Sequence, residues 1–210
     1  SIVISSGAFG VPLIGRSREV ASLTVHAEVA ATRGRFVAIR GEAGLGKSRL
    51  VAEFLKLMRH EGRRIGVGMA PEYARSPYTA FAEALGALRA DPLPVPLDAP
   101  DDGRSAWFGN VAEILRHVAS ESPHGTVIVL EDLHWADVAT IELLLFCAAR
   151  LDDARILFIV TYREDEIEFD PARARALGAL ERAAEVITLH ALAPGQIEHL
   201  IHAILYHTGR

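Results

Sequence analysis

The chain has 210 residues, of which 50% are hydrophobic and 23% charged, so general disorder is excluded and one sizeable α/β domain is expected. Its formal net charge of −5 excludes nucleic-acid binding driven by overall charge alone. A single cysteine, Cys147, excludes an intramolecular disulfide and favours a buried thiol in a reducing, cytoplasmic compartment. No apolar run approaches the roughly 18 residues of a membrane span, and we expect neither membrane contact nor a signal peptide.

Strands and helices are predicted to alternate along the chain. Apolar, β-favouring runs predict strands at 36–40, 65–69, 126–130, 154–161 and 185–189. Helices are predicted at 47–60, 77–90, 105–120, 138–150, 172–184 and 194–206. The acidic, proline-rich segment 91–102 is predicted to be a loop. This alternation implies βαβ units and a mostly parallel sheet.

A phosphate-binding motif follows the first predicted strand. It reads Gly41, Glu42, Ala43, Gly44, Leu45, Gly46, Lys47 and Ser48, which matches G-x-x-x-x-G-K-[ST] between a strand and a helix. Glycines let backbone N–H groups turn toward a phosphate, and the following helix N-terminus adds positive potential. Lys47 is expected to reach the β- and γ-phosphates, and Ser48 to bind Mg²⁺. We include the next residue, Arg49, in the predicted nucleotide site.

Two adjacent carboxylates, Glu131 and Asp132, follow the strongest predicted strand, 126–130. At the carboxyl end of a strand, one carboxylate can serve Mg²⁺ while the other polarises a water toward the γ-phosphate. We assign Glu131 to the metal and Asp132 to the water, and the residues alone leave the reverse assignment open. Both are predicted catalytic residues.

A predicted γ-phosphate sensor, Arg163, lies just past the strand at 154–161. A guanidinium at this edge of an α/β sheet can bind a phosphate bidentately, and the alternative is a surface ion pair with Glu164 or Asp165. The only asparagine, Asn110, lies in a predicted helix, so no strand-end asparagine can act as the sensor. The chain also lacks the Asn-Lys-x-Asp motif expected of a guanine-specific GTPase.

Other polar residues near these motifs are expected to be structural. His134 is a candidate base, but we expect His134 and Trp135 to pack the loop and Asp137 to cap the next helix. Three arginines in the helix at 172–184 are expected on a solvated face, the alternative being an arginine finger for a neighbouring subunit: Arg173, Arg175 and Arg182.

Together these motifs resemble the ATPase domain of STAND-type, AAA+-like signalling proteins. That group includes large ATP-binding LuxR-type transcription regulators and ATPase modules attached to adenylate cyclases. The resemblance covers about residues 11–205 and is carried by segments 14–19, 44–50, 73–78, 130–137 and 161–163. It implies a three-layer P-loop NTPase fold with a five-stranded parallel sheet in the order 5-1-4-3-2. It also implies ATP or ADP with Mg²⁺ rather than GTP.

The resemblance also implies roles for the leading segment and a domain division. Ile14, Gly15 and Arg16 would lie near the adenine, and Arg163 would replace the usual AAA+ asparagine. Residues 1–34 would form a lead and adenine-side helix, 35–193 the ATPase core, and 194–210 the start of a helical lid. The rest of the lid and the sensor and output domains would lie outside this chain.

The leading functional hypothesis is ATP binding with slow, Mg-dependent hydrolysis, acting as a switch in a multidomain signalling or transcription-regulatory protein. The expected partners are those missing domains and a second subunit, with no direct nucleic-acid contact by this segment. The first alternative is a nucleotide-binding scaffold that hydrolyses nothing and works through protein contacts. The second is a small-molecule kinase, whose acceptor-binding residues the sequence does not identify.

Overall fold

The structure is a computed structural model that describes residues 13–73, 76–88, 101–166 and 170–207. Its strands are β1 Arg35–Arg40, β2 Arg64–Met69, β3 Thr126–Glu131, β4 Ile156–Tyr162 and β5 Glu185–Thr188. Its helices are α1 Ser17–Ala30, α2 Lys47–His60, α3 Thr79–Ala87, α4 Asp101–Ser120, α5 Val138–Arg150, α6 Pro171–Ala183 and α7 Pro194–His207. A short 3₁₀ turn, Leu133–Trp135, follows β3.

The strands form one parallel sheet in the order β2-β3-β4-β1-β5. This confirms the predicted α/β fold and the order 5-1-4-3-2, read from the other edge. Two of the three interior strands, β3 and β4, are buried at every position, in keeping with their mostly apolar sequences.

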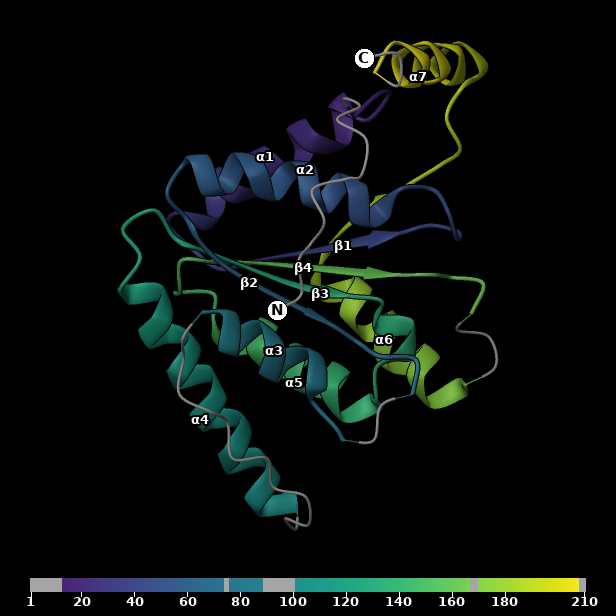
Figure 1. Cartoon of the computed structure of the whole chain (residues 1–210). Coiled ribbons are helices and arrows are strands. Elements are labelled where there is room, and N and C mark those ends of the chain that lie inside the picture. Colours follow the sequence, from purple (N-terminus) through teal and green to yellow (C-terminus); the bar gives the residue numbers. More distant parts are fainter. Residues whose placement is uncertain (1–12, 74–75, 89–100, 167–169, 208–210) are drawn as a thin grey trace.

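Two hydrophobic clusters cover the two faces of the sheet. Helices α1 and α2 pack on one face, and α3, α4, α5 and α6 lie on the other (Figure 1). Alternate residues of β3 serve the two layers, since Val127 and Val129 join the α1/α2 cluster and Ile128 and Leu130 join the opposite one. The result is the three-layer arrangement that βαβ units predict.

Several boundaries differ from the sequence prediction for local reasons. Helix α3 begins at Thr79 rather than residue 77, because Tyr78 adopts a left-handed backbone with φ 62°. Helix α4 already begins at Asp101, directly after the last proline of the run; residues 91–100 of the predicted loop lie outside the described part. Strand β4 begins at Ile156 because Ala154 closes a turn onto the carbonyl of Leu151.

Helix α3 lies unusually close to β2, and two glycines make that possible. A Cβ on Gly68 would stand 1.8 Å from the carbonyl oxygen of Ala80, and one on Gly66 would stand 2.4 Å from that of Ala84. Only glycine fits against the helix backbone at these distances. These two glycines make β2 harder to recognise as a strand from the sequence. They are nevertheless required for the close packing of β2 against α3.

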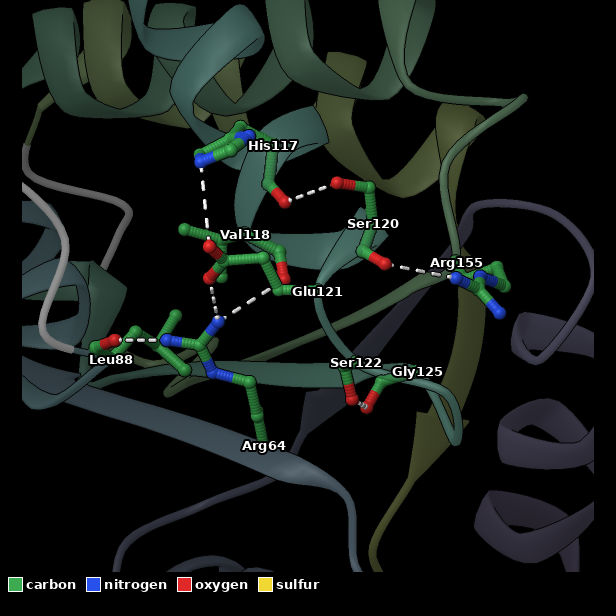
Figure 2. A network of polar contacts seen from close by, with 9 residues as sticks. All are labelled: Arg64, Leu88, His117, Val118, Ser120, Glu121, Ser122, Gly125 and Arg155. Atoms are coloured by element: carbon green, nitrogen blue, oxygen red, sulfur yellow. Dashed lines mark hydrogen bonds and ion pairs between the residues drawn. The ribbon is translucent and has the colours of Figure 1, made fainter.

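At the amino edge of the sheet, Arg64 joins three elements. Its guanidinium donates to the carbonyl oxygens of Leu88, after α3, and Val118, in α4, and forms an ion pair with Glu121 at 2.7 Å (Figure 2). This network holds α3 and α4 against the start of β2. In the part of the chain that the structure describes, no helix is long and apolar enough to cross a membrane.

Candidate functional site

The phosphate loop lies between β1 and α2, at the carboxyl edge of the sheet. Gly44 and Gly46 have φ angles of 77° and 86°, which side chains rarely tolerate. A Cβ at either position would meet no protein atom within 4 Å, so the inner face of the loop is open. The N-terminus of α2 begins at Lys47, directly after this turn. The loop therefore has the form of an anion-binding cradle.

Lys47 is held inside the loop. Its Nζ donates to the carbonyl oxygens of Gly41 at 2.6 Å and Glu42 at 2.8 Å, and the residue is 7% exposed. Burial and the nearby charge of Arg163 lower the pKa of Lys47. Three carboxylates in the same region oppose that shift: Asp132, Asp165 and Glu166. Residues from the phosphate loop, from the end of β3 and from the end of β4 thus share one electrostatic environment.

Ser48 and Glu131, the two predicted magnesium ligands, meet across the site. The Ser48 hydroxyl donates a hydrogen bond to the Glu131 carboxylate, which is 7% exposed. Burial raises the pKa of Glu131, the Ser48 hydrogen bond opposes that rise, and Asp132 adds to it. The second oxygen, Oε2, is buried without a hydrogen-bond partner. A hydroxyl beside an unpartnered carboxylate oxygen is a donor set that suits Mg²⁺.

Asp132 turns the chain out of β3 with a strained backbone. Its φ and ψ are 59° and 42°, a left-handed conformation that is uncommon for a residue other than glycine. The conformation is supported by its own amide, which donates to the hydroxyl of Thr161 on β4 at 3.1 Å. Such strain is found most often at functional sites. The adjacent strand therefore fixes the backbone of the predicted water-orienting residue.

The residues after Asp132 are structural, as predicted. The His134 side chain is fully buried, and its ring centroid lies 4.6 Å from that of Trp135. Asp137 caps α5 by accepting from the amide of Thr140 at 2.8 Å. It also accepts from the amide of Tyr78 at 3.2 Å, a contact that the sequence did not indicate.

Arg163 faces the site with a partner that the sequence reading missed. Its guanidinium forms an ion pair with Glu166 and lies 5.5 Å from the centroid of the Trp135 ring. Glu164, one of the two partners considered from the sequence, instead pairs with Arg40 at 2.6 Å. In the sequence, this ion pair is indicated only by the three-residue spacing of Arg163 and Glu166. This signal is weak, because this segment carries several acids.

The leading segment reaches the same site from the other side. Arg16 is 6% exposed and donates to the carbonyl oxygens of Leu45 in the loop, at 3.0 Å, and His190 after β5, at 2.7 Å. Gly15 has a φ of 73°, and a Cβ there would stand 2.8 Å from the side chains of Leu192 and Gln196. The Arg16 side chain therefore connects the leading segment to the phosphate loop by hydrogen bonds to backbone carbonyl oxygens.

A cavity of about 320 Å³ lies between this segment, the phosphate loop and α7. Most of its lining is apolar: Leu13, Ile14, Leu45, Ala191, Leu192 and Ile197, with Arg16, Gly44, Gly46 and Arg49 beside them. An apolar cavity next to a phosphate cradle has the character of a site for a planar base. The contribution of residues 191–197 was missed from the sequence, because nothing local links them to the loop.

One expectation about α6 was wrong. Arg173 was expected on a solvated face, but its Nη1 donates to the carbonyl oxygen of His134 at 2.8 Å. Arg175 and Arg182 are exposed, as expected. The difference arises because α6 packs beside α5 and brings its first turn against the 3₁₀ turn after β3.

The chain belongs to the AAA ATPase domain family, whose sequence profile matches residues 12–160. Its fold is similar to that of Cdc6p from Pyrobaculum aerophilum, with a TM-score of 0.66 and 17% identity, covering 96% of this chain and 52% of that one. A chain in the structure of Drosophila ORC bound to poly(dA/dT) DNA and Cdc6 matches with a TM-score of 0.53 and 10% identity, covering 90% of this chain and 31% of that one.

A chain in the structure of Drosophila ORC bound to GC-rich DNA and Cdc6 matches with a TM-score of 0.51 and 12% identity, covering 84% of this chain and 57% of that one. This chain therefore spans about a third to a little over half of these structural relatives. At such identities the likeness shows the fold alone. No curated protein sequence gives a significant match.

Proposed function

We propose that this AAA ATPase domain binds ATP with Mg²⁺, hydrolyses it slowly, and acts as a nucleotide switch in a multidomain signalling or transcription-regulatory protein. The observation that carries the proposal is the meeting of Ser48, from the phosphate loop, with Glu131, from the end of β3. A phosphate cradle and an acidic strand end that touch are what phosphoryl transfer to water requires.

Each residue has a distinct part in this proposal. The loop amides and Lys47 bind the β- and γ-phosphates, and Lys47 exchanges its carbonyl partners for phosphate oxygens. Ser48 and Glu131 hold Mg²⁺, which supplies positive charge to the phosphates. Asp132 orients the attacking water and accepts its proton. Arg163 binds the γ-phosphate, so its contact exists with ATP and not with ADP.

The cavity beside Ile14 and Leu45 is proposed to hold the adenine. Gly44 and Gly46 line the same cavity, so a base bound there would be continuous with phosphates in the loop. Arg49 lies at this boundary and would contact the nucleotide. The position of Arg16 supports an indirect role, in which it holds the lead segment and the loop in register.

The biological setting is also a proposal. The STAND-type resemblance supports a signalling or transcription-regulatory context, with lid, sensor and output domains and a second subunit as partners. A similar chain belongs to the structure of Drosophila ORC bound to poly(dA/dT) DNA and Cdc6, and that assembly supports a second subunit as a partner. A net charge of −5 supports the absence of direct nucleic-acid contact by this segment. Burial raises the pKa of the Cys147 thiol to about 12, in keeping with an inert residue in the cytoplasm.

The alternative is a scaffold that binds nucleotide without hydrolysis. It would use the same loop and cavity, so binding alone does not separate the two functions. The acid pair Glu131 and Asp132 favours hydrolysis, because a scaffold has no use for a water-orienting carboxylate.

Steady-state phosphate release, measured beside titration with a fluorescent ATP analogue, tests the proposal. We expect Mg-dependent ATP binding and a turnover that is measurable but below about 1 s⁻¹, the low end of the common enzyme range. Lys47→Ala should nearly abolish binding, because a charged hydrogen bond is worth about 1.5–3 kcal/mol and its loss also leaves the phosphates uncompensated. Binding without release would favour the scaffold, and binding unaffected by Lys47→Ala would refute the site.

A further inference from the structure

Glu166 is an acidic residue that lies close to both Arg163 and Lys47. It lies just after β4, and its carboxylate pairs with the Arg163 guanidinium. The same carboxylate stands 3.3 Å from Nε2 of His134, which is fully buried, and is hydrogen-bonded by the Trp135 side chain. Arg163 and Trp135 therefore bind this acid, and His134 lies beside it.

Two cations and three carboxylates share this edge of the sheet. Lys47 and Arg163 are close enough that each disfavours the charge of the other, and Asp132, Asp165 and Glu166 are the carboxylates that compensate Lys47. The Arg163 hydrogen bond lowers the pKa of Glu166, so that carboxylate is ionised at neutral pH. A γ-phosphate entering this space brings the same kind of charge that Glu166 now supplies to Arg163.

We infer that Glu166 is the internal competitor of the γ-phosphate for Arg163, and that this competition sets how strongly the domain prefers ATP to ADP. The inference rests on the proposed function, because it assigns a specificity-determining role at the same site. ATP must displace the Glu166 carboxylate to reach Arg163. ADP has no γ-phosphate, leaves the Arg163–Glu166 pair formed, and is indifferent to it.

The size of the effect follows from how often the pair is formed. A ligand that needs the free side chain loses apparent affinity in proportion to the fraction that is free. A pair of this kind, with Arg163 28% and Glu166 35% exposed, is typically worth up to about 1 kcal/mol. Removing the competitor should therefore raise ATP affinity by up to about fivefold and leave ADP affinity unchanged.

The chain offers a closely matched control two residues away. Glu164 has the same charge and lies in the same segment, but its carboxylate pairs with Arg40, at 2.6 Å, and not with Arg163. A general effect of negative charge near the phosphates would appear with either acid. A competition for Arg163 should appear with Glu166 alone.

The test is competitive displacement of a fluorescent nucleotide by ATP and by ADP, in Mg²⁺, for wild type, Glu166→Gln, Glu164→Gln and Arg163→Ala. We expect Glu166→Gln to raise the ATP-over-ADP preference about threefold to fivefold and Glu164→Gln to leave it within twofold. In the Arg163→Ala background the Glu166→Gln effect should vanish, because the object of the competition is gone. Glu166→Ala, which removes the acceptor altogether, should repeat the Glu166→Gln result.

Three outcomes would overturn the inference: an unchanged preference in Glu166→Gln, an equal gain for ATP and ADP, or a gain that persists without Arg163. Failure of the proposed function looks different. There the wild type would bind neither nucleotide, or Lys47→Ala would bind both as tightly as the wild type does.

Discussion

Two arginines with nearly equal exposure lie at opposite edges of the sheet, and their partners differ in kind. The side chain of Arg64, at the amino edge, is 30% exposed, and that of Arg163, at the carboxyl edge, is 28% exposed. Arg64 is held by two backbone carbonyls and a carboxylate, from the ends of α3 and α4 (Figure 2). Among the described residues, Arg163 has one ion pair and an aromatic neighbour. Backbone acceptors cannot move away, whereas one carboxylate can be replaced by another anion.

The turns at the two edges show the same contrast. At the amino edge, the left-handed position before β3 is taken by Gly125, with φ 86°, and the Ser122 hydroxyl donates to its carbonyl (Figure 2). At the carboxyl edge, the left-handed position after β3 is taken by Asp132. Glycine meets this geometry at lower cost than aspartate does. At the amino edge, the residue in the left-handed position is the one that favours stability. At the carboxyl edge, Asp132 keeps a charged side chain at a position where glycine would cost less free energy.

The largest expected effect concerns catalysis at the carboxyl edge. Asp132→Asn should leave MgATP binding near normal and lower turnover by about 10²-fold, the usual scale for a residue that orients or deprotonates a water. Phosphate release and nucleotide titration measure the two quantities. If Asp132→Asn abolishes Mg-dependent binding and Glu131→Gln does not, the two assigned roles are reversed.

The matching change at the amino edge should affect only stability. Arg64→Ala should lower the free energy of unfolding by about 2 kcal/mol, because it leaves the carbonyls of Leu88 and Val118 without their donor. Urea unfolding followed by circular dichroism measures this, and ATP affinity should stay within twofold. Arg155→Ala is the control at the same edge, since its carbonyl contacts are long, at 3.3 Å, and exposed. A loss of ATP affinity in Arg64→Ala would break the proposed separation of the two edges.

At the carboxyl edge we expect the opposite result, a change in ATP binding with little change in stability. Arg163→Ala should weaken ATP binding about tenfold, the scale of one charge-assisted contact, and leave ADP binding unchanged. Its free energy of unfolding should change by less than about 1 kcal/mol, because its ion pair with Glu166 is partly exposed. Equal losses for ATP and ADP would make Arg163 a structural residue like Arg64.

The smallest expected effect comes from the hydroxyl that supports the strained turn. Thr161→Val should cost about 1 kcal/mol of stability and slow turnover modestly, because the amide of Asp132 loses its acceptor. Thr126→Val is the matched control at the amino edge. Its hydroxyl is buried without a partner, so we expect a neutral or slightly stabilising change. Similar costs for the two variants would show that the Thr161 hydrogen bond does not support Asp132.

The sequence alone determined the five strands, helices α2 to α7 and the phosphate loop, because these depend on neighbours in the chain; helix α1 was expected only from the family resemblance. Periodicity located the strands within two residues at each end, and the loop motif needs only its flanking strand and helix. The cap at Asp137 was predictable for the same reason, since its acceptor and donor are three residues apart. The strand order followed from a family resemblance rather than from any local signal.

What only the tertiary structure decided is which distant side chains meet. Arg16 finds acceptors 29 and 174 residues away, and the cavity wall at residues 191–197 faces a loop that lies far from it in sequence. Arg173 turned inward because helix packing brought its turn to the carbonyl of His134. Glu166, rather than Glu164, pairs with Arg163 because Arg40, at the end of the neighbouring strand, already holds Glu164. These contacts depend on the order of strands in the sheet, because that order determines which residues lie beside the end of each strand. No single segment of the sequence specifies the strand order.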